Sequence, residues 1–331
     1  RGLEVESETQ QRDPSSSGSS VQLMANFGAL NMRGGKFNKS ARHACEVSID
    51  LLEKGISLLL QALPSYHTTL TSKYYPGAGG REVEGFEDFQ MATGELQEVS
   101  LDGLTEDEQL VFWINTVNLL YLHAFMVFGA SNTAATREKI LEKASYVISG
   151  QEYPLSMIEH LIIGHNFKPC PTMGNLKIPK MKFKDKDPRK KKLLEKTPHL
   201  IHFCVAGGAA CMPPLGVLRG DGEGGVEEEM REIVRGALGR MFREEGKIFL
   251  PVYLEWHRKD FPKKENDFVD MMVDLSGLKP PHNFHNFDVV FEEENWKLKY
   301  FLQHFQKKIK ITEAILNYPE GEEEEKEEEK E

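Results

Sequence analysis

A run of nineteen residues, Leu110 to Phe128, most constrains the fold of this chain because it is almost wholly apolar. It is long enough to cross a bilayer, but Asn115, Thr116, Asn118 and His123 lie within it, and such side chains are costly in hydrocarbon unless they are paired. A helix that is apolar on all sides is typical of a fully buried core element. We therefore predict a central core helix and no membrane span.

The start of this helix is marked by its own chemistry. Thr105 and Glu108 have the spacing of a capping box, in which the Thr hydroxyl bonds the Glu amide and the Glu carboxylate bonds the Thr amide. Gly129 is expected to close the far end.

Apolar spacing predicts the remaining elements, which are listed here in chain order. We expect a helix over 39–63 ended by Pro64, a helix over 85–97, a hairpin over 146–153 with Gly150 at its turn, a helix from Ser156, a buried strand over 200–205, a helix over 226–245, and strands over 247–253, 287–291 and 296–301. The fold class is therefore α+β and helix-dominant, with a single globular core, a small mixed or antiparallel sheet and disordered termini.

The two ends of the chain differ in composition from its body. Residues 1–20 are polar, and residues 320–331 hold nine Glu and two Lys, so neither stretch can bury enough apolar surface to fold. We predict a disordered segment over 1–20, a helical N-terminal extension over 21–82, a main domain over 83–262, a part over 263–318 that packs on the same core, and a disordered acidic tail over 319–331.

Charge and cysteine content narrow the class of function. The net charge of −11 comes largely from the tail. The sequence does not indicate the domain-wide basic surface that is typical of nucleic-acid-binding proteins, so we expect no nucleic-acid partner. The four cysteines have no CxxC spacing, which argues against a disulfide framework and favours the cytoplasm or another reducing intracellular compartment. A targeting segment upstream of Arg1 would not be visible, and the oligomeric state is not indicated.

Four segments together resemble the family of domains of unknown function numbered 547 (DUF547). They are Phe112-Trp113-Ile114-Asn115 with Asn118, Ile158-Glu159-His160, the stretch from Ile201 to Leu215, and Trp256 with Asp260-Phe261; Asp288 to Leu298 resembles the family's closing segment more weakly. The family pattern implies a thiol hydrolase that uses a Glu, a His and the Cys of a Ser-Cys-Pro-Pro segment.

This chain departs from that pattern at the nucleophile. Pro213-Pro214 align with the family's Pro pair, which places Met212 in the cysteine position and Cys211 in the neighbouring serine position. A thioether cannot form a thiolate. We therefore predict a catalytically degenerate or non-catalytic protein-interaction module that binds a protein partner. The alternative is a cysteine-dependent hydrolase or acyltransferase with Cys211 as nucleophile, His160 as base and Glu159 as the orienting or oxyanion-side residue.

Other candidate residues have mainly structural interpretations. Asn115, Asn118 and Trp113 are expected to fix packing or to orient a ligand. His199 and His202, like His282 and His285, form an HxxH pair, but residues three apart on a strand face opposite ways, so we predict no metal site and no cofactor. The stretch 177–196 holds ten basic residues. It is a solvated loop, a docking surface for an acidic partner or for the chain's own tail, or a localisation signal.

Overall fold

The computed structural model describes residues 29–33, 42–66, 84–128, 141, 143–164, 182–194, 198–207 and 211–293. Its helices are α2 (Ala44–Tyr66), α3 (Phe86–Thr93), α4 (Glu106–Phe128), α6 (Gly225–Leu238), α7 (Val252–Trp256) and α8 (Glu265–Ser276). Short helical turns are η1 (Leu30–Arg33), η2 (Gly94–Gln97), η3 (Met157–Ile163), η4 (Pro188–Lys192), η5 (His199–Phe203), η6 (Arg258–Asp260) and η7 (Phe284–Asn286). The strands are β1 (Ser145–Ile148), β2 (Gln151–Pro154), β3 (Lys247–Leu250) and β4 (Asp288–Phe291).

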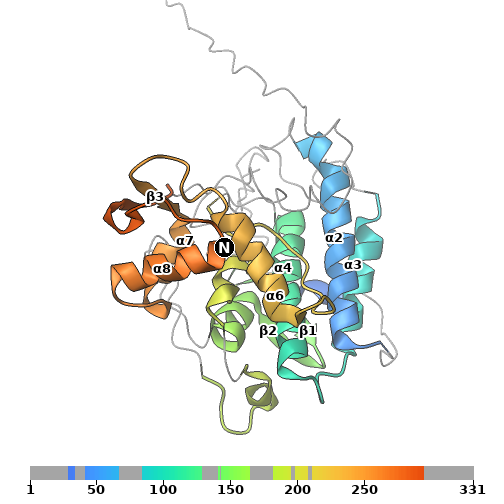
Figure 1. The fold of residues 1–331 in the computed structure, drawn as a ribbon. Coiled ribbons are helices and arrows are strands. Elements are labelled where there is room, and N and C mark those ends of the chain that lie inside the picture. The colour runs from blue at the N-terminus through green and yellow to red at the C-terminus, as the bar shows by residue number, and fades with distance from the viewer. Residues whose placement is uncertain are drawn as a thin grey trace, which may run out of the picture.

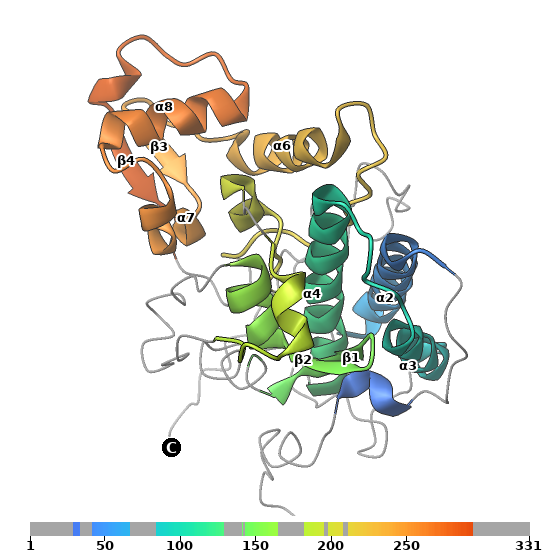
Figure 2. The same ribbon diagram turned by 90° about the horizontal axis from the view of Figure 1, so that it is seen from below.

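The predicted core helix is confirmed as α4, which runs through the centre of the molecule beside α2 (Figures 1 and 2). It has the length and composition of a membrane-crossing helix, and its most apolar stretch is entirely buried by the protein. The capping box is also present. The Thr105 amide donates to Glu108 at 2.7 Å, and the Glu108 amide donates to the Thr105 hydroxyl at 3.2 Å.

One glycine sets the distance between the two central helices. A Cβ atom added to Gly55 of α2 would lie 2.7 Å from Cδ2 of Leu122 on α4 and 3.1 Å from the ring of Phe89 on α3. The missing side chain therefore lets the three helices approach more closely than any other residue would permit.

The strands form two separate pairs in the described part of the chain. The predicted hairpin is confirmed: β1 and β2 pair antiparallel, and the turn is made by Ser149 and Gly150, both at positive φ. β3 and β4 pair parallel, with Lys247 opposite Asp288. The helix-dominant α+β class is thus confirmed, while the small sheet is divided into one antiparallel and one parallel pair.

One element and several boundaries differ from the sequence prediction. The expected strand over 200–205 is wrong, because these residues form the helical turn η5; a short apolar run suits a buried turn as well as a buried strand. The strand β3 ends at Leu250, where Pro251 interrupts the backbone donors and begins α7. Helix α6 ends at Leu238, before Gly239. Helix α2 continues past Pro64 to Tyr66.

Gly129 and the strand expected over 296–301 lie outside the described residues.

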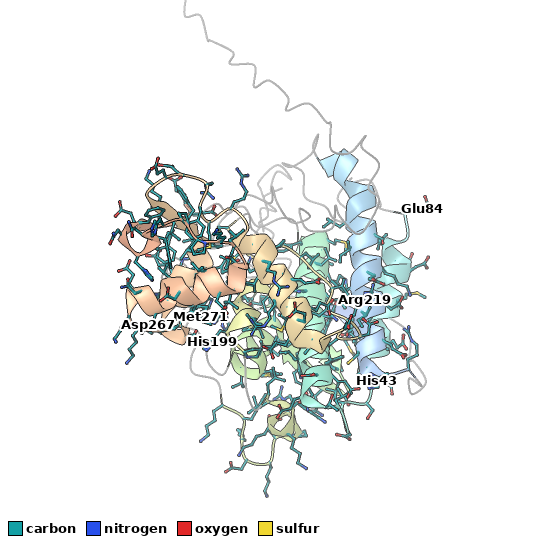
Figure 3. The ribbon with its side chains drawn as sticks, in the orientation of Figure 1. His43, Glu84, His199, Arg219, Asp267 and Met271 are labelled. Atoms are coloured by element: carbon teal, nitrogen blue, oxygen red, sulfur yellow. The ribbon has the colours of Figure 1, made fainter. Side chains whose placement is uncertain are left out.

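Arg219 and its neighbours connect α6 to α2. Figure 3 labels Arg219 beside these helices, and its guanidinium forms an ion pair with Glu53 of α2. The backbone amides of Arg219 and Gly220 both donate to the Glu229 carboxylate of α6, at 2.8 and 2.9 Å. These contacts attach the segment before α6 to both helices.

Candidate functional site

Asn118 fixes the loop that carries Cys211. Its Nδ2 donates to the carbonyl oxygen of Cys204 at 2.9 Å and contacts that of Gly216 at 3.4 Å, while its Oδ1 accepts from the amide of Ala206 at 2.8 Å. Both ends of the loop are therefore hydrogen-bonded to one side chain of α4.

Asn115 fixes the same segment further along. Its amide pairs with the peptide of Leu218, donating to the carbonyl oxygen at 2.7 Å and accepting from the N–H at 2.9 Å. Trp113 is buried, with its ring 5.0 Å from that of Phe112 and 5.1 Å from that of Tyr153. Asn115 and Asn118 therefore bind the backbone of this segment, and Trp113 packs in the hydrophobic core.

Cys211 and Met212 lie on this loop. Both side chains are half-buried and pack against the hydrophobic core. Met212, which the resemblance places in the family's cysteine position, is thus part of the packing of the loop.

Glu159 and His160 lie on η3, a π-helical turn that packs on α4. The Glu159 carboxylate accepts a hydrogen bond from the hydroxyl of Tyr121, a fully buried residue of α4. His160 is buried, close enough to His257 that a charge on His160 lowers the pKa of His257. The two predicted catalytic residues therefore face different surroundings.

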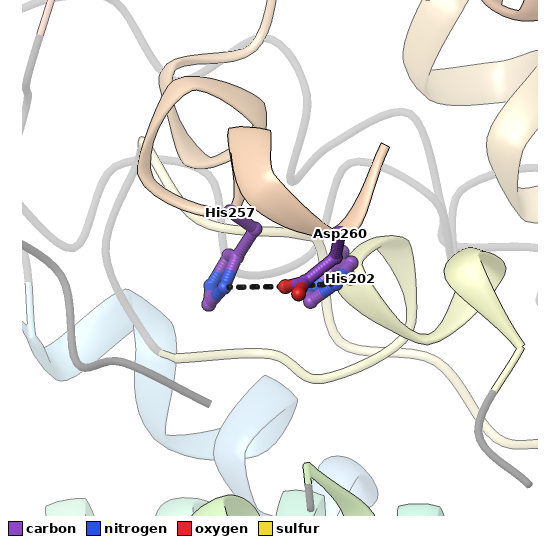
Figure 4. Close-up of side chains that lie close together, drawn as sticks. All are labelled: His202, His257 and Asp260. Atoms are coloured by element: carbon purple, nitrogen blue, oxygen red, sulfur yellow. Dashed lines mark ion pairs between the residues drawn. The ribbon is translucent and has the colours of Figure 1, made fainter. Parts of the chain in front are cut away.

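A cluster that sequence inspection did not identify joins His202, His257 and Asp260 (Figure 4). Oδ2 of Asp260 lies 3.3 Å from Nε2 of His202 and 3.8 Å from Nδ1 of His257. The two imidazole rings stack with centroids 4.1 Å apart. His202 comes from η5, whereas His257 and Asp260 come from the turn that follows α7, so the cluster connects two distant segments of the chain.

Burial determines the charge state of this cluster. It lowers the pKa of His202 despite the opposing effect of Asp260. It also lowers the pKa of His257 to about 3, with the charge on His202 acting in the same direction. The hydrogen bond from His202 lowers the pKa of Asp260. At neutral pH the cluster therefore consists of two neutral imidazoles beside one carboxylate.

Comparison with known proteins gives one family. Residues 101–234 match the model described as "Protein of unknown function, DUF547". The chain contains a DUF547 domain. No curated protein and no solved structure matches the chain.

The DUF547 match covers α4, η3, η5 and most of α6, and it lies inside the predicted range 83–262. His202 is within it, while His257 and Asp260 follow it in the chain. The cluster is therefore completed by residues on the C-terminal side of the matched segment.

The sequence drew attention to two of the three residues of this cluster but did not indicate that they are in contact. His202 and Asp260 both lie in segments that carry the DUF547 resemblance, but nothing in their spacing indicates contact. The prediction that His199 and His202 face opposite ways on a strand was wrong, because these residues form a 3₁₀ turn, in which side chains three apart lie on the same side. The rings of His199 and His202 indeed both lie near that of Phe261, at 5.7 and 5.5 Å.

The arrangement permits two kinds of chemistry. A carboxylate that orients an imidazole is the supporting pair of a nucleophilic site. Two neutral imidazoles and a carboxylate are also a common set of metal ligands.

Proposed function

We propose that this DUF547 domain is a protein-interaction module that has lost the cysteine chemistry implied by the family pattern, and that its partner presents an acidic segment. The supporting observation is that the described part of its basic segment, residues 182–194, is anchored to the core while several of its lysines are exposed.

The anchoring contacts are specific. Phe183 is buried, and the Arg189 guanidinium lies over its ring at 5.2 Å while also forming an ion pair with Asp187. Lys192 donates to the carbonyl oxygen of Leu101 at 3.1 Å. A loop that served only solubility would not need these contacts.

The side chains of Lys184, Lys186 and Lys191 are exposed and form no ion pair within the part of the chain that the structure describes. A fixed cationic surface binds an acidic segment with less entropic cost than a flexible one, and the attraction weakens as salt screens it.

The test uses the chain's own acidic tail sequence, 320–331, as a labelled synthetic peptide, with binding followed by fluorescence anisotropy. We expect binding that falls as ionic strength rises from about 0.05 to 0.3 M, a range over which the screening length shortens about twofold. The triple variant Lys184→Glu, Lys186→Glu, Lys191→Glu is expected to lose binding.

A charge-matched control is available on another surface. Lys259, Lys263 and Lys264 are equally exposed, and their replacement by Glu changes the net charge by the same amount. If both triple variants weaken binding equally, the attraction comes from net charge and the proposal is contradicted. Equal binding of an oligonucleotide of the same charge would indicate a general polyanion surface, which also contradicts it.

A cysteine-dependent hydrolase is the second candidate, and the His202–Asp260 pair is the observation that favours it. The base would then be His202, oriented by Asp260, with Cys211 as nucleophile. Against this, a buried imidazole with a lowered pKa disfavours the imidazolium that must form beside a thiolate.

Thiol alkylation resolved by mass spectrometry separates the two candidates. Burial raises the pKa of Cys45 to about 11 and raises that of Cys204 as well, so both provide internal references for unreactive thiols. The interaction module predicts that Cys211 alkylates as an ordinary, partly accessible thiol. Fast alkylation at neutral pH that disappears in His202→Ala would establish the hydrolase instead.

A further inference from the structure

The cluster of His202, His257 and Asp260 has the composition of a metal site, and the proposed interaction does not use it. The potential ligand atoms of the three residues all lie within 4.8 Å of one another. We infer that these three side chains bind one divalent transition-metal ion of the zinc class.

The distances between ligand atoms suit a small ion. Zinc binds nitrogen and oxygen ligands at about 2.0–2.2 Å in tetrahedral geometry, which places neighbouring ligand atoms about 3.3–3.6 Å apart. Oδ2 of Asp260 already lies 3.3 Å from Nε2 of His202 and 3.8 Å from Nδ1 of His257. Both carboxylate–imidazole distances are therefore close to those of a zinc site.

The stacking of the two rings indicates which side chain must move. The lone pair of an imidazole nitrogen lies in the plane of its ring, so two stacked rings point their lone pairs along parallel planes. One ring has to turn before a nitrogen of each ring can point at the same ion. The side chain of His257 is 18% exposed and that of His202 only 3%. Rotation of His257, the less confined of the two, completes the site.

The donor set selects the class of ion. Magnesium and calcium prefer sites made almost wholly of oxygen, whereas imidazole suits zinc, copper, nickel and iron. Both imidazoles are next to the ionised carboxylate of Asp260, so the three ligands together offset one of the two positive charges of the ion.

The site also has an access route and a free position. The side chain of Asp260 is 34% exposed, which gives an ion a path from solvent. Three protein ligands leave one tetrahedral position for water or a partner's ligand, as in zinc sites that are not purely structural. The buried ring of Phe261 closes the inner side beside His202.

Metal binding would give this cluster a mechanical role as well. His202 belongs to the segment that leads into the loop held by Asn118, while His257 and Asp260 follow α7. An ion bound by all three would link these two parts of the fold, and the free energy of binding would add to the stability of the folded state.

The test uses the full chain after treatment with a chelator, titrated with Zn²⁺ by calorimetry and with Co²⁺ by visible absorption. We expect one ion per chain, the absorption intensity of a four-coordinate cobalt site and no thiolate charge-transfer band. Mg²⁺ and Ca²⁺ at the same concentration are expected not to compete.

Two variants and a matched control assign the ligands. Asp260→Asn keeps the shape of the side chain, and His257→Ala removes the more exposed imidazole; each is expected to weaken zinc binding by roughly 100-fold or more, exceeding the 10–100-fold typical of outer-shell changes. His285→Ala is the control, because Nε2 of His285 lies 2.8 Å from Asp270 in an exposed His–Asp pair elsewhere. It should bind zinc like the parent chain.

Three results would overturn the inference. They are the absence of stoichiometric zinc uptake by the parent chain, equal loss in His285→Ala, and binding that depends on Cys211 but not on Asp260. Each variant is first checked by far-ultraviolet circular dichroism, and the measurement on the parent chain alone decides the first point. The triple lysine-to-glutamate variant should still bind zinc, so failure of the acidic-partner proposal would leave this result unchanged.

Discussion

Replacing Asn118 by Ala is expected to be among the most damaging single changes in the described part of this protein. The substitution leaves the carbonyl of Cys204 and the amide of Ala206 without their partner in a buried environment. A buried polar group that loses its hydrogen bond costs about 1–3 kcal/mol, so two such groups give about 2–6 kcal/mol. Against a total stability of about 5–15 kcal/mol for a domain, we expect a loss of about 3–5 kcal/mol.

The assay is denaturant unfolding followed by tryptophan fluorescence, for which the buried Trp113 and Trp256 provide a signal. Gln109→Ala is the matched control on the same helix. The Gln109 side chain donates a single bond to the carbonyl of Leu104 at 3.0 Å in a partly exposed position. Water can replace that bond, so the control is expected to cost no more than about 1 kcal/mol.

The same variant tests whether Asn118 positions the loop. Since both stems of the loop bind this side chain, Asn118→Ala should raise the alkylation rate of Cys211 under native conditions, while Gln109→Ala should not. A loss of less than about 1 kcal/mol, together with an unchanged alkylation rate, would refute the argument that this amide holds the loop in place.

Three further changes have outcomes that follow directly from the structure. Gly55→Ala places a methyl group against Leu122 and should cost about 1–3 kcal/mol, seen as a lower melting temperature, unless α2 and α4 can separate freely. Thr105→Ala removes the acceptor of the Glu108 amide and should cost about 1 kcal/mol in denaturant unfolding; no loss would contradict the role of the cap. His257 has a pKa near 6.5 when unfolded and about 3 when folded, so only the unfolded chain takes up this proton between these values. The metal-free protein should therefore be most stable above about pH 6.5 and lose up to about 1.4 kcal/mol per pH unit as pH falls, and His257→Asn should reduce that slope; an unchanged slope would contradict the lowered pKa.

The parts of the fold that could be predicted are those specified by neighbouring residues. The capping box of α4 depends on two residues three positions apart, and the turn of the β1–β2 hairpin depends on Ser149 and Gly150. The central position of α4 followed from composition alone, because a helix that is apolar on every side has to be buried.

The parts that could not be predicted depend on distant contacts. The apolar run over 200–205 suits either a strand or a helical turn, and its packing against α6 favours the turn. Buried Asn31 is a comparable case: it exchanges hydrogen bonds with the backbone of Val147 at 2.7 and 2.8 Å and thereby attaches η1 to β1. No pattern near Asn31 in the sequence indicates that contact.

The candidate site shows the same limit more sharply. Glu159 and His160 were selected because they match the family pattern, and nothing in that pattern indicates the surroundings of either side chain. His202 and Asp260 were visible as single residues in two resembling segments, and only the folding of the chain brings Nε2 of His202 to 3.3 Å from Oδ2 of Asp260. A site made from separate segments requires the three-dimensional structure.

The His202–Asp260 pair raises the question of whether Met212 is the missing part of a thiol site, and placing a cysteine at position 212 answers it. In the double variant Cys211→Ser, Met212→Cys, one thiol occupies the position that the family pattern gives to the nucleophile. If the pair serves a metal ion, its imidazoles stay neutral, and the alkylation of the new thiol should follow an ordinary thiol pKa of about 8.5. Alkylation that instead persists at pH values below about 7 and is lost in an added His202→Ala change would mean that the pair activates thiolates. The cluster would then be the remainder of a nucleophilic site, and the metal ion would have no part in explaining why these residues lie together.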